Sequence, residues 1–199
     1  MSKVKIAVVV GATRDTRFAL KPSEWIVETA RQRGDMEVEL LDLKSFDLPF
    51  FNEAASNRWM PSKDPKAIAW QKKVGEFDGF IVVTPEYNRS ITGALKNAFD
   101  QAYLEWNFKP IGFVGYGVVG AARAIEHART IAIELKMVPV RAAVHIGGSE
   151  FSAVSRGGGN KPLAAIEDAI RPAAKEMLDD LALWAKAAKA LREEVAVAA

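Results

Sequence analysis

The feature that most constrains this chain is a regular alternation between short apolar runs and longer helical patterns. Five runs rich in Val, Ile and Phe each end at a turn of glycine, proline or polar residues, and each is followed by a stretch of helical periodicity. Strands separated by helices favour a parallel sheet with right-handed crossovers. The predicted strands span residues 4–10, 36–43, 77–84, 109–116 and 138–146, and the predicted helices span residues 18–33, 65–76, 91–104, 121–136 and 162–195.

This alternation predicts an α/β protein with the flavodoxin-like fold, a three-layer α/β/α sandwich around a five-stranded parallel sheet in the order 2-1-3-4-5. A classical dinucleotide-binding domain would usually need a sixth strand. No repeat or domain-scale linker interrupts the pattern, so we expect residues 1–199 to form a single domain. Residues 44–64 form the least regular segment, and residues 52–61 and 147–199 carry no motif that can be assigned. The latter is predicted as a loop to residue 161 and then a long helix in which Pro172 is a candidate break point.

Composition narrows the classes of function. The chain contains 27 Lys+Arg and 25 Asp+Glu, a formal net charge of +2. That excess is too small to favour nucleic acid, although it does not oppose a phosphorylated ligand. The absence of cysteine excludes disulfides, thiolate metal ligands and cysteine nucleophiles. The apolar run nearest the N-terminus covers only residues 4–10, too short to cross a membrane, so we expect a cytoplasmic protein without a membrane partner.

In the predicted order, strands 1, 3 and 4 are neighbours, and their carboxyl ends place three loops side by side. The first loop has the composition of an anion site. Gly11 lets the backbone turn closely, Thr13 and Thr16 offer hydroxyl groups, and Arg14 and Arg17 offer guanidinium forks suited to phosphate oxygens. The helix that follows directs its first amides at the same place. The alternative is a solvated, basic connecting loop.

The second loop turns a buried strand into a helix. Because Pro85 lacks a backbone N–H and fixes its own φ, we expect the amides of Glu86, Tyr87 and Asn88 to be free to bind a flat, polar ligand. Ser90 is predicted to cap the following helix. Two roles are open to Tyr87: contact with the ligand, or packing beneath the turn, which is the commoner role for a single tyrosine.

The third loop begins Gly115-Tyr116-Gly117 and reads Gly-x-Gly-x-x-Gly through Gly120. Between a strand and a helix, this pattern suggests a Rossmann dinucleotide site. We do not adopt that interpretation, because the pattern follows the fourth strand rather than the first. In the flavodoxin-like interpretation, the glycines allow the backbone to approach one edge of a planar ligand.

The stretch from residue 84 to residue 100 reads Thr-Pro-Glu-Tyr-Asn-x-Ser-Ile-x-Gly-x-Leu-Lys-Asn-x-Phe-Asp. It resembles the flavin-contacting segment of the NAD(P)H-dependent FMN reductase family, which includes quinone, chromate and azo reductases of the flavodoxin-like fold. The similarity runs from about residue 4 to residue 140 and is strongest from residue 82 onward. The first loop departs from the family's Gly-Ser-x-Arg-x-x-Ser/Arg, because Ala12 replaces the serine and Asp15 lies inside the loop.

The resemblance implies FMN as the cofactor, with NADPH or NADH as co-substrate. The phosphate is expected at Gly11, Thr13, Arg14, Thr16 and Arg17. Amides of the second loop would bind the N5 and pyrimidine edge of the flavin, and the third loop would approach the pyrimidine edge. Because the redox chemistry belongs to FMN, no catalytic side chain is expected. No metal is expected either, since two histidines far apart without carboxylates at ligand spacing are usually structural.

The function implied is that of an FMN-dependent NAD(P)H oxidoreductase with ping-pong kinetics. Hydride would pass from the nicotinamide to FMN N5 and then to a quinone, an azo compound, a metal oxyanion or free flavin. By resemblance, the helix predicted at residues 91–104 would make the contact of a homodimer, alone or within a homotetramer that is a dimer of dimers. Two alternatives stay open: a flavodoxin-type electron carrier without nicotinamide chemistry, and a flavin-free regulatory protein on the same fold.

Overall fold

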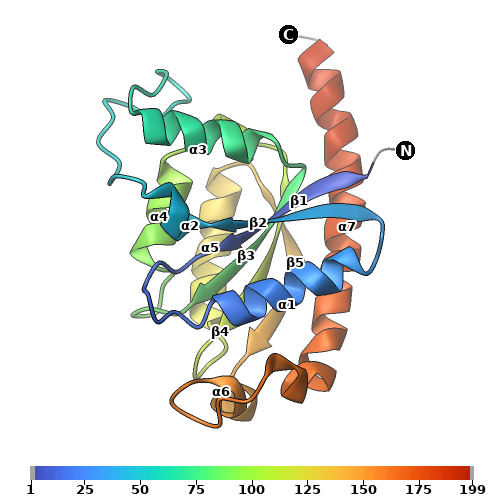
Figure 1. Ribbon diagram of the computed structural model, residues 1–199. Helices are drawn as coiled ribbons and strands as arrows, with labels where there is room; N and C mark the ends of the chain where they lie inside the picture. Colours follow the sequence, from blue (N-terminus) through green and yellow to red (C-terminus); the bar gives the residue numbers. More distant parts are fainter. Residues whose placement is uncertain (1–2, 198–199) are drawn as a thin grey trace.

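The centre of the molecule is one parallel sheet, described here from a computed structural model covering residues 3–197. Its strands are β1 (Val4–Val10), β2 (Met36–Asp42), β3 (Gly79–Pro85), β4 (Pro110–Tyr116) and β5 (Val138–Ile146), in the order β2-β1-β3-β4-β5 (Figure 1). Every neighbouring pair is parallel. The predicted fold class and strand order are therefore confirmed.

Helices cover both faces of the sheet. On one face α1 (Leu20–Arg31) and α7 (Glu167–Val197) pack against the strands, and on the other face lie α3 (Pro65–Gly75), α4 (Gly93–Asp100) and α5 (Ala122–Glu134) (Figure 1). The shorter elements are α2 (Leu43–Phe46), α6 (Gly148–Val154), and two 3₁₀ turns, η1 (Leu104–Trp106) and η2 (Leu163–Ile166).

The sheet divides the core into two apolar layers. Every residue of β3 and β4 is buried, as expected for central strands covered on both faces. On the α3 and α4 side, Trp106 packs edge-on against Phe80, with ring centroids 4.6 Å apart, and also contacts Trp70. On the α1 and α7 side, Ile26 and Met177 are fully buried. These two layers hold the strand ends in fixed positions at the edges of the sheet.

Three local predictions were wrong. Residues 147–161 contain helix α6, which is stabilised because Phe151 packs edge-on against Phe18 at 5.5 Å. Pro172 does not break α7, which runs without interruption from Glu167 to Val197 with this proline inside it. The helix predicted at residues 91–104 is shorter, because the chain leaves α4 at Asp100 and forms η1, which buries Trp106.

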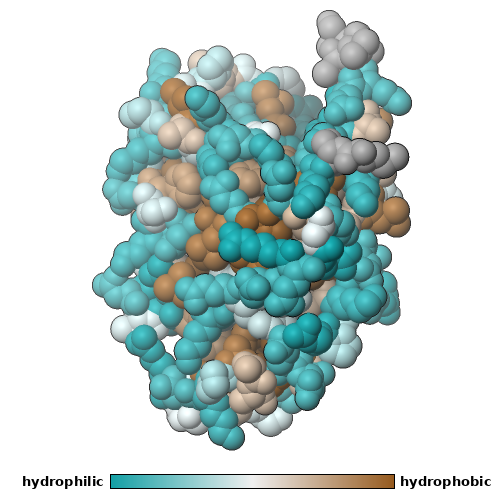
Figure 2. Space-filling view, turned by 45° about the vertical axis from the view of Figure 1, so that its right-hand side comes forward, coloured by the Kyte–Doolittle hydropathy of each residue, from teal (hydrophilic) through white to brown (hydrophobic). Residues whose placement is uncertain are grey.

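Hydrophilic side chains cover most of the face in Figure 2, and apolar side chains reach the surface there in scattered groups. Among the helices of residues 3–197, none combines the length and apolar character needed to cross a membrane.

Candidate functional site

The three predicted loops meet at the carboxyl edge of the sheet, because β1, β3 and β4 are adjacent parallel strands. The backbone N–H of Gly11 donates to the carbonyl of Val83 at 2.8 Å, which ties the start of the first loop to β3. The hydroxyl of Thr92 donates to the Gly11 carbonyl at 2.5 Å and accepts from the N–H of Leu95 at 3.0 Å. One threonine thus joins the first loop to the amino end of α4.

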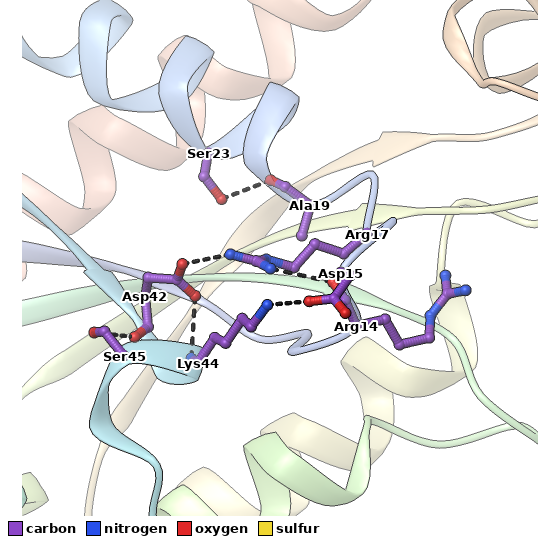
Figure 3. A network of polar contacts seen from close by, with 8 residues as sticks. All are labelled: Arg14, Asp15, Arg17, Ala19, Ser23, Asp42, Lys44 and Ser45. Atoms are coloured by element: carbon purple, nitrogen blue, oxygen red, sulfur yellow. Dashed lines mark hydrogen bonds and ion pairs between the residues drawn. The ribbon is translucent and has the colours of Figure 1, made fainter.

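The two arginines of the first loop have different surroundings (Figure 3). Arg17 has a nearly buried side chain, only 7% exposed, and its guanidinium donates to Asp42 at 2.5 Å and to the Arg14 carbonyl at 3.1 Å. Arg14 points away from Asp42 and is exposed. Asp15 forms an ion pair with Lys44, whose hydrogen bond and charge lower the pKa of the Asp15 carboxyl. Of the two guanidinium groups, that of Arg14 is therefore the more accessible to a ligand.

The amino end of α1 keeps polar groups without partners. The helix begins at Leu20, and no side chain caps it. The hydroxyl of Tyr116 lies buried near the backbone of Ala19, and neither this hydroxyl nor the Nε of Arg17 has a hydrogen-bond partner in the described part of the chain. Burial raises the pKa of Tyr116 well above its ordinary value, so the hydroxyl stays a donor. Buried polar groups normally find a partner, and an anion at this helix end would provide one.

The second loop is a tight turn rather than an open run of amides. Tyr87 and Ser90 exchange backbone hydrogen bonds of 2.9 and 3.0 Å, and both residues between them, Asn88 and Arg89, have positive φ. Positive φ at both central residues is the requirement of a type I′ turn. The prediction that the Tyr87 N–H is free was therefore wrong. In the described residues, the N–H groups of Glu86 and Asn88 donate to no protein acceptor.

The same turn overturns the predicted cap at Ser90. The backbone of Ser90 is used by the turn, and the helix begins two residues later than expected, at Gly93 with Thr92 as its N-cap. The hydroxyl of Ser90 instead lies 2.7 Å from Nδ1 of His127 on α5.

Tyr87 reaches across to the first loop. Its hydroxyl accepts a hydrogen bond of 2.6 Å from Nε of Arg14, and the guanidinium lies 5.7 Å from the ring centroid. The Tyr87 side chain is half-buried. Its side chain links the predicted phosphate loop to the predicted ring loop.

The carboxylate of Glu86 was not predicted to have a partner, yet it anchors the turn to α5. It forms an ion pair with the guanidinium of Arg123 and accepts from the Arg123 N–H at 3.2 Å. Burial favours the neutral acid, but the hydrogen bonds and charge of Arg123 outweigh it and lower the pKa of Glu86. A carboxylate at a helix amino end is stabilised by the helix dipole. The sequence pointed to this pair only indirectly. Strands 3 and 4 were predicted to be neighbours, Glu86 follows strand 3, and Arg123 follows strand 4.

The third loop presents backbone on one side and an aromatic ring on the other. Gly117 has φ +133, and a Cβ built on it would meet no atom within 4 Å, so its backbone borders open space. Tyr116 is 3% exposed and packs between Phe18, at 5.0 Å, and Phe151, at 6.3 Å. From the sequence, we expected Tyr116 to approach the flavin ring together with Gly115 and Gly117. In the structure, the hydroxyl of Tyr116 lies near the amino end of α1.

Comparisons with known proteins agree with this geometry. A solved structure with the same fold is FerB, a flavoenzyme NAD(P)H:(acceptor) oxidoreductase from Paracoccus denitrificans, with a TM-score of 0.69 and 23% identity over 92% of this chain and 97% of that one. The fold is thus one found in flavoenzymes. Residues 4–150 match the model of the NADPH-dependent FMN reductase family.

Two curated relatives are also reductases by name. An NAD(P)H-dependent FMN reductase, ntnL, from Nectria sp is 29% identical over 164 residues, which cover 77% of this chain and 82% of the relative. A 2-hydroxy-1,4-benzoquinone reductase from Burkholderia sp is 32% identical over 142 residues, covering 68% and 73%. The chain belongs to the NADPH-dependent FMN reductase family. It is accordingly an oxidoreductase that uses FMN and a reduced nicotinamide.

Proposed function

We propose that the three loops bind FMN and that the chain passes two electrons from NAD(P)H through it to a small-molecule acceptor. The observation that carries the proposal is the set of unpartnered donors at the amino end of α1. There the Tyr116 hydroxyl and the Nε of Arg17 are buried without acceptors among residues 3–197, beside an exposed Arg14. A phosphate is an acceptor of suitable charge for such a site.

Each loop has its own role in this proposal. Gly11, Thr13, Arg14, Thr16 and Arg17 hold the phosphate, with Asp42 keeping the Arg17 guanidinium in place. Pro85 to Asn88 contact the ring, where the free N–H groups of Glu86 and Asn88 are the available donors. Gly117 lets the backbone approach the pyrimidine edge, Gly115 leaves room for the Gly120 carbonyl of the same loop, and Tyr116 reaches back to the phosphate.

Bound FMN supplies the chemistry by accepting a hydride at N5 and passing it on. The side chains and amides of the three loops position the ring and provide donors for the negative charge that reduction places on it. With a quinone as acceptor, NAD(P)H loses a hydride, and the quinone gains two electrons and two protons, the second proton coming from water. Because both ligands would use one open face of the ring, we expect ping-pong kinetics, measurable as parallel double-reciprocal plots.

A quinone, an azo compound, a metal oxyanion and free flavin are the acceptor classes proposed. The name of the Burkholderia relative supports a quinone for that protein. The experiment is to purify the chain, titrate it with FMN by fluorescence quenching, and mix the complex anaerobically with NADPH or NADH. Bleaching of the flavin absorbance followed by reoxidation with a quinone supports the proposal. FMN binding without bleaching would indicate an electron carrier, and no FMN binding would contradict both.

We further propose that the chain acts as a homodimer, or a dimer of dimers, in the cytoplasm, where NAD(P)H is available. Helix α4 offers a face that can pair with its own copy about a two-fold axis, because Lys96 and Asp100, 2.7 Å apart, carry opposite charges on its exposed side. Sedimentation equilibrium tests the assembly, and cell fractionation tests the location.

A further inference from the structure

The carboxylate of Glu86 caps a helix whose own start has no capping side chain. Helix α5 follows Ala121, which has left-handed backbone angles and a methyl side chain that cannot accept a hydrogen bond. The Glu86 carboxylate, from the second loop, instead accepts from the N–H of Arg123 at 3.2 Å and from the N–H of Ala124. The first N–H groups of a helix need such partners, so the second loop completes the start of α5.

The guanidinium of Arg123 faces the same carboxylate. Its Nε donates to Oε1 of Glu86 at 2.5 Å, and its Nη2 forms an ion pair with the same oxygen. The two side chains differ in exposure, because that of Glu86 is 8% exposed and that of Arg123 is 47% exposed. The carboxylate is therefore nearly buried, whereas the charge that neutralises it reaches the solvent. Replacing the guanidinium would leave a negative charge that water can screen only weakly.

The pair joins the two loops proposed to hold the flavin ring. Glu86 lies in the second loop, and its backbone N–H, which has no acceptor among residues 3–197, is one of the donors offered to the ring. Arg123 lies in the first turn of α5, directly after the third loop. One turn further along α5, Nδ1 of His127 lies 2.7 Å from the hydroxyl of Ser90, at the other end of the tight turn. Two contacts with α5 therefore fix the position of the carboxylate relative to both loops.

A fixed charge at this place matters because reduction adds a charge to the ring. A hydride carries two electrons and one proton, so its transfer from NAD(P)H leaves one negative charge on the flavin. A unit charge roughly 10 Å from another changes an equilibrium about tenfold at an effective dielectric constant of about 20. A lone carboxylate at Glu86 would disfavour the reduced ring, a lone guanidinium at Arg123 would favour it, and the ion pair brings the two effects close to cancellation.

We propose that Glu86 and Arg123 are positioning residues that set the reduction potential of the bound flavin. The ion pair holds the second loop on α5, and it keeps the carboxylate neutralised beside the ring. This inference rests on the proposed function, because it takes the ring to lie between the second and third loops. Its signature is a pair of opposite effects: the loss of either charge alone shifts the potential, and the two shifts have opposite signs.

The test measures the midpoint potential of the flavin in the FMN-saturated protein, at one pH and by equilibration with a reference dye. For Arg123→Gln we expect the equilibrium constant for reduction to fall about tenfold, which is about 30 mV for a two-electron couple. For Glu86→Gln, which keeps the backbone N–H, we expect a rise of similar size, and for the double variant a return to within about twofold of the wild type. A pair with a structural role alone would not give opposite signs, because a loosened loop loses donors to the reduced ring in every variant.

The matched control is Glu126→Gln. Glu126 lies on the same helix, carries the same charge and pairs with Arg129 at 3.6 Å, but its side chain is 74% exposed. Solvent should screen it, so the equilibrium constant for reduction should change less than about twofold. Arg123→Lys keeps the positive charge without the planar guanidinium. Its potential should stay close to that of the wild type even where its affinity for oxidised FMN falls.

Unchanged potentials, or shifts of the same sign, in Arg123→Gln and Glu86→Gln would overturn the proposal, and so would an equal shift in Glu126→Gln. If circular dichroism of the cofactor-free chain shows that Arg123→Gln does not fold, the sign for Glu86→Gln decides alone. A loosened loop would lower the equilibrium constant, whereas a lone guanidinium would raise it. A wild type that binds no FMN would instead contradict the proposed function.

Discussion

At the amino edge of the sheet, the buried carboxylate of Asp78 is paired with two cations, whereas at the carboxyl edge two buried donors have no partner in the described residues. The carboxylate of Asp78 accepts from the Lys5 N–H at 3.0 Å, from Lys189 at 3.3 Å and from Arg192 at 2.6 Å. At the opposite edge, the hydroxyl of Tyr116 and the Nε of Arg17 donate to nothing in the described chain.

The two edges therefore have different roles. The paired charges of the amino edge stabilise the fold, and the unpartnered donors of the carboxyl edge are available to bind a ligand. An unpartnered buried donor costs roughly 1–3 kcal/mol, so a ligand that accepts from both donors of the carboxyl edge would gain binding energy there. The network around Asp78 at the amino edge fastens the end of α7 to the strands. We therefore expect substitutions at the amino edge to change stability alone, and substitutions at the carboxyl edge to change cofactor binding.

The largest expected effect is at Asp78, whose side chain is 11% exposed. Asp78→Asn removes the charge that compensates Arg192 and Lys189, and breaking a largely buried ion pair costs on the order of 3 kcal/mol. Urea unfolding of the cofactor-free chain measures the loss, and FMN affinity should not change. Glu176→Gln, at the exposed ion pair with Arg141, is the control and should have little effect. Equal losses in the two variants would remove the distinction between the edges.

The next effect is steric and lies in the third loop. A Cβ on Gly115 would come within 2.9 Å of the Ala121 side chain and closer still to the Gly120 carbonyl. Overpacking of this kind costs roughly 1–3 kcal/mol, so Gly115→Ala should lower the free energy of unfolding and weaken FMN binding together. Gly93→Ala is the matched control, because a Cβ there meets nothing within 4 Å at the first position of α4. It should be neutral or slightly stabilising. A neutral Gly115→Ala would mean that this loop can shift.

The strands were predictable because burial on both faces selects continuous β-branched runs. The bounds of β1 and β5 match their predicted ranges. The predicted strand order was then sufficient to place the three loops side by side, and no side-chain contact had to be known. Helix α6 was missed because its stability comes from contacts of Phe151 with residues far away in sequence.

The partners of the site residues were harder to predict than their positions. Periodicity does not say that Glu86 pairs with Arg123 or that Arg17 pairs with Asp42, because each pair depends on the final placement of two loops. The turn at Asn88 and Arg89 was not predicted because arginine rarely adopts positive φ.

Lys109, at the amino edge, should make the free energy of unfolding depend on pH. Lys109 is 5% exposed and donates to the carbonyls of Val74 and Gly75 at the end of α3. Burial, aided by the charge of Arg192 and opposed by Asp78 and Glu105, lowers the pKa of Lys109 to about 8 from its ordinary 10.5. Between these two pH values, the unfolded chain keeps a proton that the folded chain has lost.

Stability should therefore rise with pH through that interval, by on the order of 2–3 kcal/mol. Urea unfolding from pH 7 to pH 10.5 measures it, and Lys109→Met supplies the reference, since methionine cannot titrate. The difference between the wild type and Lys109→Met should be constant below about pH 8 and should then move in favour of the wild type. A difference that stays constant throughout would show that Lys109 keeps its ordinary pKa in the folded chain.

The smallest expected effect separates the two arginines of the first loop. Arg14 is exposed, with Nε bonded to the Tyr87 hydroxyl, while Arg17 is nearly buried against Asp42. Arg14→Gln should weaken FMN binding about 10- to 30-fold, the loss of one charge-assisted phosphate contact, with almost no change in the urea midpoint of the cofactor-free chain. Arg17→Gln should lower that midpoint, because it leaves Asp42 uncompensated. If Arg14→Gln destabilises the chain as much as Arg17→Gln while FMN affinity is unchanged, then the exposed guanidinium is structural. The unpartnered donors at the amino end of α1 would then need another ligand.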